Sequence, residues 1–213
     1  RKLKQYILLM EVIMSYRTEQ EEFWATEFGN DYINRNQDYI SNIPFISKVI
    51  NRTFNVKSVI EFGCNIGLNL KALNTLLPEC ELTGVEINDS ACKFLHEWGG
   101  CNVINNSIFD YNENRKYDLS MIKTVLIHIN PDMLNDVYEK LYDSSNRYIL
   151  IAEYYNPTPV NVTYRKHSDR LFKRDFAGEM LDKYRDLTLV DYGFIYHRDN
   201  YFPQDDINWF LLE

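Results

Sequence analysis

Residues 59–69 read Val59-Ile60-Glu61-Phe62-Gly63-Cys64-Asn65-Ile66-Gly67-Leu68-Asn69, an apolar strand followed by a glycine turn and the start of a helix. Gly63 lets the chain turn sharply, and Gly67 lets a ligand approach the backbone. Asn65 occupies the middle-glycine position of a three-glycine loop, and asparagine tolerates a left-handed backbone well. The pattern is typical of nucleotide-binding α/β domains, but an ordinary tight turn also produces it.

Outward from this turn, apolar segments alternate with helical segments. The alternation predicts strands at residues 57–62, 81–86, 102–105, 117–122 and 147–153, and helices at 68–77, 89–98 and 130–142. Apolar strands that alternate with helices imply a parallel sheet whose two faces are both covered.

The last part of the sequence departs from this alternation. Strands are predicted at residues 187–197 and 207–212, and the loop 198–206 leaves no room for a crossover helix. This pair is therefore expected to be antiparallel. We predict an α/β, Rossmann-like methyltransferase fold, with a mostly parallel seven-stranded sheet, a C-terminal antiparallel strand pair and helices on both faces.

Length and composition restrict the number of domains, the partners and the location that we expect. The chain has 213 residues, 45% of them apolar, and shows no linker, which predicts a single domain with a helical N-terminal lid or extension (1–56) and a Rossmann-like core (57–213). The net charge of −8 disfavours nucleic acid as a partner. The four cysteines lack metal-ligand spacing, so we expect reduced thiols, no bound metal and a cytoplasmic location. The apolar run near the N-terminus is interrupted by Glu11 and is too short to span a membrane.

Acidic residues at two strand ends point to the ligand. Glu86 ends the strand that follows the glycine turn, where a carboxylate can accept both ribose hydroxyls. Ser107 and Ile108 follow the third strand and can read the adenine edge and pack on its ring. These features permit NAD or S-adenosylmethionine, and Glu61 favours the latter, because an acid suits an ammonium and a sulfonium but not a pyrophosphate. The alternatives are a solvated acid at Glu86 and a loop-capping carboxylate at Glu61.

Several further segments carry a family resemblance. They are Glu19-Gln20-Glu21-Glu22-Phe23-Trp24, Glu27-Phe28-Gly29-Asn30-Asp31-Tyr32, Arg35-Asn36, Lys123-Thr124-Val125-Leu126-Ile127-His128-Ile129-Asn130-Pro131, Glu153-Tyr154-Tyr155-Asn156-Pro157, Leu171-Phe172-Lys173-Arg174-Asp175-Phe176-Ala177 and Gln204-Asp205-Asp206-Ile207-Asn208-Trp209-Phe210-Leu211-Leu212. With the glycine motif, the chain resembles the class I S-adenosylmethionine-dependent methyltransferases, and within them the pseudaminic acid biosynthesis-associated methylase family. Lys166 departs from the glycine expected before His167. The resemblance implies a cytosolic enzyme of nonulosonic-acid or surface-glycan pathways without establishing its acceptor.

The expected cofactor site combines the motif with the segments around it. Its residues are Trp24, Arg35, Glu61, Gly63, Cys64, Asn65, Gly67, Asn69, Glu86, Ile87, Ser107, Ile108 and Lys123. The N-terminal segment is interpreted as a lid that places Arg35 near the cofactor's carboxylate. The alternative is a helix that packs on the sheet through Phe23, Trp24 and Phe28.

Candidate catalytic and acceptor residues follow the fourth and fifth strands. His128 is the first candidate base and His167 the second, since histidine titrates near neutrality. Tyr154, Tyr155 and Tyr164 are expected to form an acceptor wall. A basic strip at residues 164–175 offers Arg165 and Arg170 for an anionic acceptor. The alternatives are a packed histidine, core tyrosines and a solvated charged surface.

The sequence therefore predicts methyl transfer from S-adenosylmethionine to an oxygen or nitrogen of a small, anionic, sugar-related acceptor. The alternatives are a protein or tRNA methyltransferase, a non-catalytic partner protein that binds the same cofactor, and an NAD-dependent oxidoreductase. The oligomeric state stays open.

Overall fold

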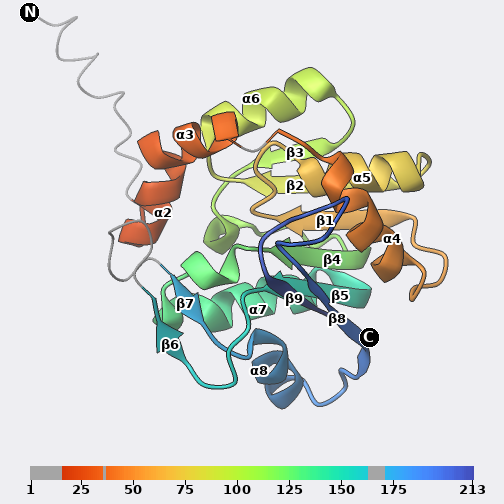
Figure 1. Cartoon of the computed structure of the whole chain (residues 1–213). Coiled ribbons are helices and arrows are strands. Elements are labelled where there is room, and N and C mark those ends of the chain that lie inside the picture. Colours follow the sequence, from red (N-terminus) through yellow and green to blue (C-terminus); the bar gives the residue numbers. More distant parts are fainter. Residues whose placement is uncertain (1–15, 36, 163–170) are drawn as a thin grey trace, which may run out of the picture.

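The computed structural model of the chain describes residues 16–35, 37–162 and 171–213. Its main sheet has seven strands in the order β3-β2-β1-β4-β5-β9-β8 (Figure 1). They are β1 (Ser58–Phe62), β2 (Glu81–Glu86), β3 (Asn102–Asn105), β4 (Tyr117–Lys123), β5 (Ser145–Glu153), β8 (Leu189–Ile195) and β9 (Ile207–Leu212). The neighbours from β3 to β5 are parallel and β9 is antiparallel to both β5 and β8, which confirms the predicted sheet.

Helices cover both faces of this sheet, as predicted (Figure 1). The helices on the two faces are α4 (Ile43–Ile50), α5 (Leu68–Leu76) and α6 (Asp89–Trp98) on one, and α7 (Leu134–Asp143) and α8 (Phe176–Lys183) on the other. Successive strand residues point to opposite faces, so Val59 packs with the first group and Ile60 with the second. Each such fully buried side chain contributes about 1.5–3 kcal/mol to stability.

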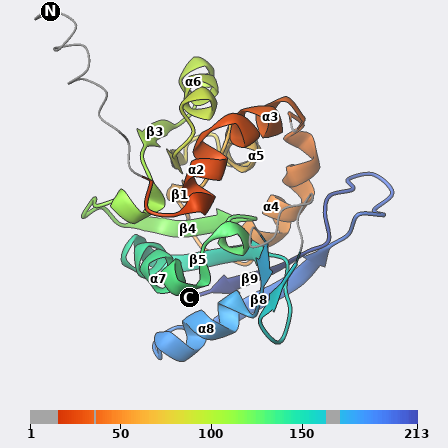
Figure 2. The ribbon, with the colours of Figure 1, turned by 90° about the vertical axis from the view of Figure 1, so that its left-hand side faces the viewer.

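The N-terminal helices α2 (Glu19–Ala25) and α3 (Glu27–Arg35) lie near α6, away from α4, α7 and α8 (Figures 1 and 2). The side chain of Thr18 caps α2 by accepting a hydrogen bond from the Glu21 amide at 3.1 Å. Short 3₁₀ turns connect other elements: η1 (Ile40–Asn42), η2 (Ile108–Asp110), η3 (Leu126–His128) and η4 (Pro131–Met133). A two-stranded ribbon, β6 (Val160–Asn161) and β7 (Phe172–Lys173), stands apart from the main sheet.

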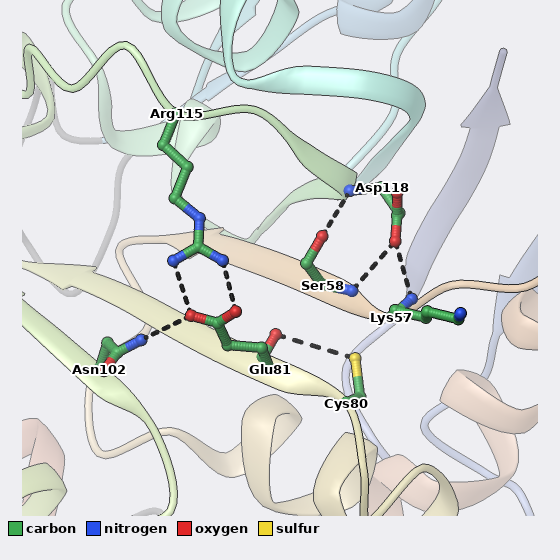
Figure 3. A network of polar contacts seen from close by, with 7 residues as sticks. All are labelled: Lys57, Ser58, Cys80, Glu81, Asn102, Arg115 and Asp118. Atoms are coloured by element: carbon green, nitrogen blue, oxygen red, sulfur yellow. Dashed lines mark hydrogen bonds and ion pairs between the residues drawn. The ribbon is translucent and has the colours of Figure 1, made fainter.

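Polar contacts join the amino-terminal ends of β1, β2 and β4 (Figure 3). The guanidinium of Arg115, just before β4, binds both oxygens of Glu81 at 2.6 and 2.5 Å. Asp118 Oδ2 accepts hydrogen bonds from the backbone amides of Lys57 (2.8 Å) and Ser58 (3.2 Å). Side-chain contacts therefore join these three strands at their amino-terminal ends.

Three further findings concern the cysteines, metal binding and membrane spans. All four cysteines are free thiols in the structure. Among the described residues, no group of three or more histidine, cysteine or acidic side chains is arranged to hold a metal. None of the described helices combines the length and the apolar character needed to cross a bilayer.

Candidate functional site

An open cleft of about 900 Å³ lies at the carboxyl ends of β1, β2 and β4. Segments distant in sequence also line it: α2, through Glu21 and Trp24, the chain between residues 37 and 42, and the loop between β8 and β9, through Gln204 and Asp205. Ligands of open α/β sheets bind beyond the carboxyl ends of the strands. The cleft therefore lies where the sheet topology predicts a binding site.

The glycine turn forms one wall of the cleft through left-handed backbone. Gly63, Asn65 and Gly67 have φ angles of 67°, 49° and 74°. A Cβ on Gly63 would lie 2.6 Å from Val125 Cγ2, and a Cβ on Gly67 would lie 2.6 Å from Leu95 Cδ2. Gly67 lies outside the residues that line the cleft, so the structure explains this glycine by the packing of α5 against α6.

Glu86 caps the turn and also lines the cleft. Its Oε2 accepts a hydrogen bond from the Asn65 amide at 2.7 Å, and its Oε1 accepts one from the Asn88 amide at 2.8 Å. Burial raises the pKa of this carboxyl, and the backbone hydrogen bonds oppose the shift. A carboxylate has about four acceptor sites, so the two amides leave Glu86 able to accept further hydrogen bonds.

Glu61, at the end of β1, is buried with one oxygen unpaired. Its Oε1 accepts a hydrogen bond from Asn69 Nδ2 at 2.6 Å, whereas Oε2 has no hydrogen-bond partner among the described residues. Burial raises the pKa of Glu61 to about 8, against the opposing effects of Asn69 and the nearby Lys123. A buried carboxylate oxygen without a partner destabilises the free protein, and a cationic ligand would relieve that cost.

Lys123 and Glu153 end the neighbouring strands β4 and β5. Glu153 Oε1 accepts hydrogen bonds from the amides of Val125 and Leu126, both at 2.9 Å, and burial still raises its pKa to about 8. Burial lowers the pKa of Lys123, and the carboxylates of Glu61, Asp205 and Glu153 oppose that shift. Glu153 thus holds the η3 turn in place while acidic groups surround the lysine.

Helix α2 closes the cleft from above the sheet. The hydroxyl of Ser107 donates a hydrogen bond to Glu21, and Asn88 Nδ2 donates to the Trp24 carbonyl at 3.2 Å. The Trp24 ring lies 4.7 Å from the His128 ring, centroid to centroid, and both rings line the cleft. His128 is only 7% exposed, so its imidazole is a buried wall of the cleft.

The structure brings most of the predicted site residues together. Those that line the cleft are Trp24, Glu61, Gly63, Cys64, Asn65, Asn69, Glu86, Ile87, Ser107, Ile108, Lys123, His128 and Tyr154. Tyr155 lies outside the lining, and its ring lies 5.9 Å from Phe210. Tyr154 and Tyr155 are successive residues of extended chain and so point to opposite sides.

Five predicted residues lie outside what the structure describes. They are Tyr164, Arg165, His167 and Arg170, together with the side chain of Arg35. The described part of the basic strip includes Lys173, whose Nζ lies 5.0 Å from the centre of the Tyr154 ring.

Sequence reasoning missed Glu21, Glu153 and Asp205. Glu153 ends a strand next to β4, which is the signal that identified Glu61 and Glu86. Glu21 and Asp205 reach the cleft from a helix and a loop that are distant in sequence. Both belong to segments that carry the family resemblance, but those segments do not single out either acid, because tertiary packing brings them to the site.

Comparisons with known proteins support the fold. No protein-family model and no curated protein sequence matches the chain. Among solved structures, 1004 chains match. The plantazolicin methyltransferase BpumL in complex with SAH is 14% identical, with a TM-score of 0.64 and coverage of 100% of this chain and 99% of that one.

Two further neighbours have the same fold. A SAM-dependent methyltransferase from Leishmania major is 13% identical with a TM-score of 0.66, over 92% of this chain and 82% of that one. The glycopeptide N-methyltransferase MtfA complexed with sinefungin is 11% identical with a TM-score of 0.63, over 83% of this chain and 94% of that one. The chain therefore has the Rossmann-like fold of SAM-dependent methyltransferases.

Proposed function

We propose that the chain is an S-adenosylmethionine-dependent methyltransferase that acts on an oxygen or nitrogen of a small acceptor. One observation carries the proposal: Glu61 Oε2 is buried in the wall of the cleft without a hydrogen-bond partner among the described residues. The methionine part of the cofactor has an ammonium and a sulfonium, and both cations suit this carboxylate. The pyrophosphate of NAD would be repelled by it.

The remaining lining fits the other parts of the cofactor. Glu86 would accept hydrogen bonds from the ribose hydroxyls, and Ser107 and Ile108 would contact the adenine. Trp24, Cys64, Asn65, Asn69, Ile87 and Lys123 complete the surrounding wall. These residues lie at the carboxyl ends of the strands and in the turns that follow them, except for Asn69 on α5 and Trp24 on α2.

Catalysis would depend mainly on alignment. When bound, the cofactor supplies a methyl group that is already activated by cationic sulfur, so the protein's main tasks are to orient the acceptor and to exclude water. His128 lines the cleft beside Trp24 and would accept the acceptor's proton. His167 is the second candidate for this role.

The proposed acceptor is small, anionic and sugar-related, and belongs to nonulosonic-acid or surface-glycan metabolism in the cytoplasm. The family resemblance supports the sugar, and the basic strip with Arg165 and Arg170 supports the negative charge. Tyr154 and Tyr164 would form the acceptor wall. Residues 1–56 would act as a lid on the core formed by residues 57–213, within one domain.

Two experiments test the function. Isothermal titration calorimetry should show binding of S-adenosylmethionine and S-adenosylhomocysteine, and NAD should fail to compete. Incubation with labelled cofactor and a panel of nucleotide-linked sugars, read by mass spectrometry, should then show a methylated product. A protein that binds NAD instead would reject the cofactor, and transfer to a protein or tRNA but not to the panel would reject the sugar acceptor.

A further inference from the structure

A second acidic group enters the cleft from the loop between β8 and β9. Asp205 lines the cleft, and its Oδ2 accepts a hydrogen bond from the hydroxyl of Tyr154 at 2.6 Å. Tyr154 follows β5, so this bond fixes the Asp205 carboxylate over the carboxyl end of the sheet. The strength of a short hydrogen bond to a charged group makes this a well-held position.

The loop is anchored on both sides of Asp205. Gln204 Nε2 donates a hydrogen bond to the Ser41 carbonyl at 2.7 Å. On the other side, the Asp206 carboxylate accepts a hydrogen bond from the His197 amide at 3.0 Å and contacts the His197 ring at 2.8 Å. The backbone that carries Asp205 is therefore held in place before any ligand binds.

Asp205 differs from the other carboxylates that act on Lys123. Glu61 and Glu153 are 1% and 2% exposed, and both accept hydrogen bonds from protein groups, Glu61 from the Asn69 side chain and Glu153 from the Val125 amide. Asp205 is exposed on the open side. Glu61 and Asp205 both line the cleft, and of the two Asp205 is the acid exposed to solvent.

We infer that Asp205 binds the methyl acceptor by accepting a hydrogen bond from an O–H or N–H group next to the one that is methylated, an inference that rests on the proposed methyltransferase function; the proton of the methylated group itself is left to His128. The carboxylate would orient this group beside Tyr154, at the strand ends where Lys123 also lies. A negative charge here repels a carboxylate or phosphate. The group that Asp205 holds is therefore a hydroxyl or an amine, and any anionic group of the acceptor points away from Asp205.

The test compares Asp205→Asn with Asp206→Asn in the full chain. Both substitutions remove one charge from the same loop. Asp206 lies outside the cleft lining, and the asparagine oxygen of Asp206→Asn can still accept the hydrogen bond from the His197 amide that anchors the loop. Calorimetry with S-adenosylhomocysteine should give dissociation constants within about twofold of wild type for both variants. With CMP-N-acetylneuraminic acid as the acceptor probe, Asp205→Asn should raise KM about tenfold and Asp206→Asn should leave it within about twofold.

A second readout uses a probe that does not depend on the natural acceptor. Wild-type crystals with S-adenosylhomocysteine are soaked in Tris, whose hydroxyl and ammonium groups are hydrogen-bond donors. Density for Tris within about 3 Å of Asp205 supports the inference, and Tris elsewhere or nowhere overturns it.

The outcomes separate this inference from the function it rests on. Equal KM values for the two variants overturn the role of Asp205 and leave the methyltransferase function standing. Absence of S-adenosylhomocysteine binding by the wild-type protein overturns both. If the cofactor product binds but CMP-N-acetylneuraminic acid is not methylated, the sugar acceptor fails, and the Tris soak alone decides the role of Asp205.

Discussion

Among single residues, the two buried acids Glu61 and Glu153 have the clearest physical consequences. Both have a pKa raised to about 8 by burial, and both keep one oxygen without a hydrogen-bond partner among the described residues. They play different parts, because Glu61 lines the cleft whereas Glu153 holds the amides of Val125 and Leu126. Protonation of Glu61 should therefore affect ligand affinity, and protonation of Glu153 should affect folding stability.

Cofactor affinity should depend on pH through Glu61. In the free protein the carboxyl is mostly protonated below its pKa of about 8, while a bound ammonium favours the ionised form. Affinity for S-adenosylhomocysteine should therefore rise from about pH 6 to about pH 8, by at most about tenfold per pH unit. Calorimetry on Glu61→Gln should give weaker binding with a flatter pH dependence. If Glu61→Gln keeps the wild-type pH dependence of affinity, Glu61 does not contact the cofactor.

Glu153 should make folding stability fall as pH rises. Its carboxyl has an ordinary pKa of 4.5 and a folded pKa of about 8, so the folded state holds the extra proton between these values. The free energy of unfolding should therefore decrease from about pH 4.5 to about pH 8. Denaturant unfolding of Glu153→Gln should show a smaller decrease. An unchanged slope would mean that Glu153 is ionised in the folded protein.

His128→Ala should lower turnover without changing cofactor affinity. Loss of a base lowers turnover by about 100-fold or more, while the described contacts proposed for adenosine remain. The check is initial-rate kinetics with labelled cofactor, with S-adenosylhomocysteine affinity as the control. Unchanged turnover would leave His128 as a packing partner of Trp24.

At the scale of elements, the docking of α2 depends on a buried acid. Glu21 is 9% exposed and accepts hydrogen bonds from the Ser107 hydroxyl and, at 2.6 Å, from the Arg17 amide. Glu21→Ala should release the helix and weaken S-adenosylhomocysteine binding by about five- to tenfold, since hydrogen bonds to charged groups contribute about 1.5–3 kcal/mol. Amide hydrogen exchange in α2 should become faster.

The neighbouring Glu22 provides a matched control, because it is exposed on the same helix. Glu22→Ala should leave both affinity and exchange close to wild type. If the two variants behave alike, the buried position of Glu21 has no special role in closing the cleft.

Elements with a strong hydrophobic period could be predicted from the sequence. The predictions for 81–86, 102–105 and 207–212 match β2, β3 and β9 at both ends, and 68–77 exceeds α5 by one residue. The predicted helix 130–142 is instead divided into η4 and α7, and the Asn130 side chain caps η4 by accepting a hydrogen bond from the Asp132 amide at 3.0 Å. The two-residue strands β6 and β7 are too short to leave a periodic signal.

The acids and the lysine of the candidate site were predictable where strand ends supply them. Glu61, Glu86 and Lys123 end adjacent parallel strands, so one edge of the sheet gathers them whatever the loops do. Asp205 depends on the path of a loop, and Glu21 depends on how a helix docks. Contacts between residues far apart in the sequence set the positions of Asp205 and Glu21, and such contacts cannot be predicted from a local pattern.

At the scale of the whole molecule, the two ends of the sheet should respond independently to mutation. Asp118→Ala removes the acceptor for the amides of Lys57 and Ser58, at the end opposite the cleft. It should lower stability by about 1–2 kcal/mol and Tm by about 2–8 °C. Affinity for S-adenosylhomocysteine should not change.

The measurement is thermal unfolding followed by calorimetry with the ligand. Asp136→Ala, an exposed change on α7, is the control and should shift stability by less than about 0.5 kcal/mol. A large loss of affinity in Asp118→Ala would mean that strain passes through the sheet from one end to the other.

The strand order has a consequence for synthesis on the ribosome. β8 pairs with β9 in the main sheet, and β9 separates it from β5, yet β9 is translated later. Until β9 emerges, β8 has no place beside β5, and its peptide groups and the side chain of Ile195, which is buried in the folded protein, stay uncovered. A nascent chain paused between these two strands is therefore the species that most needs a chaperone.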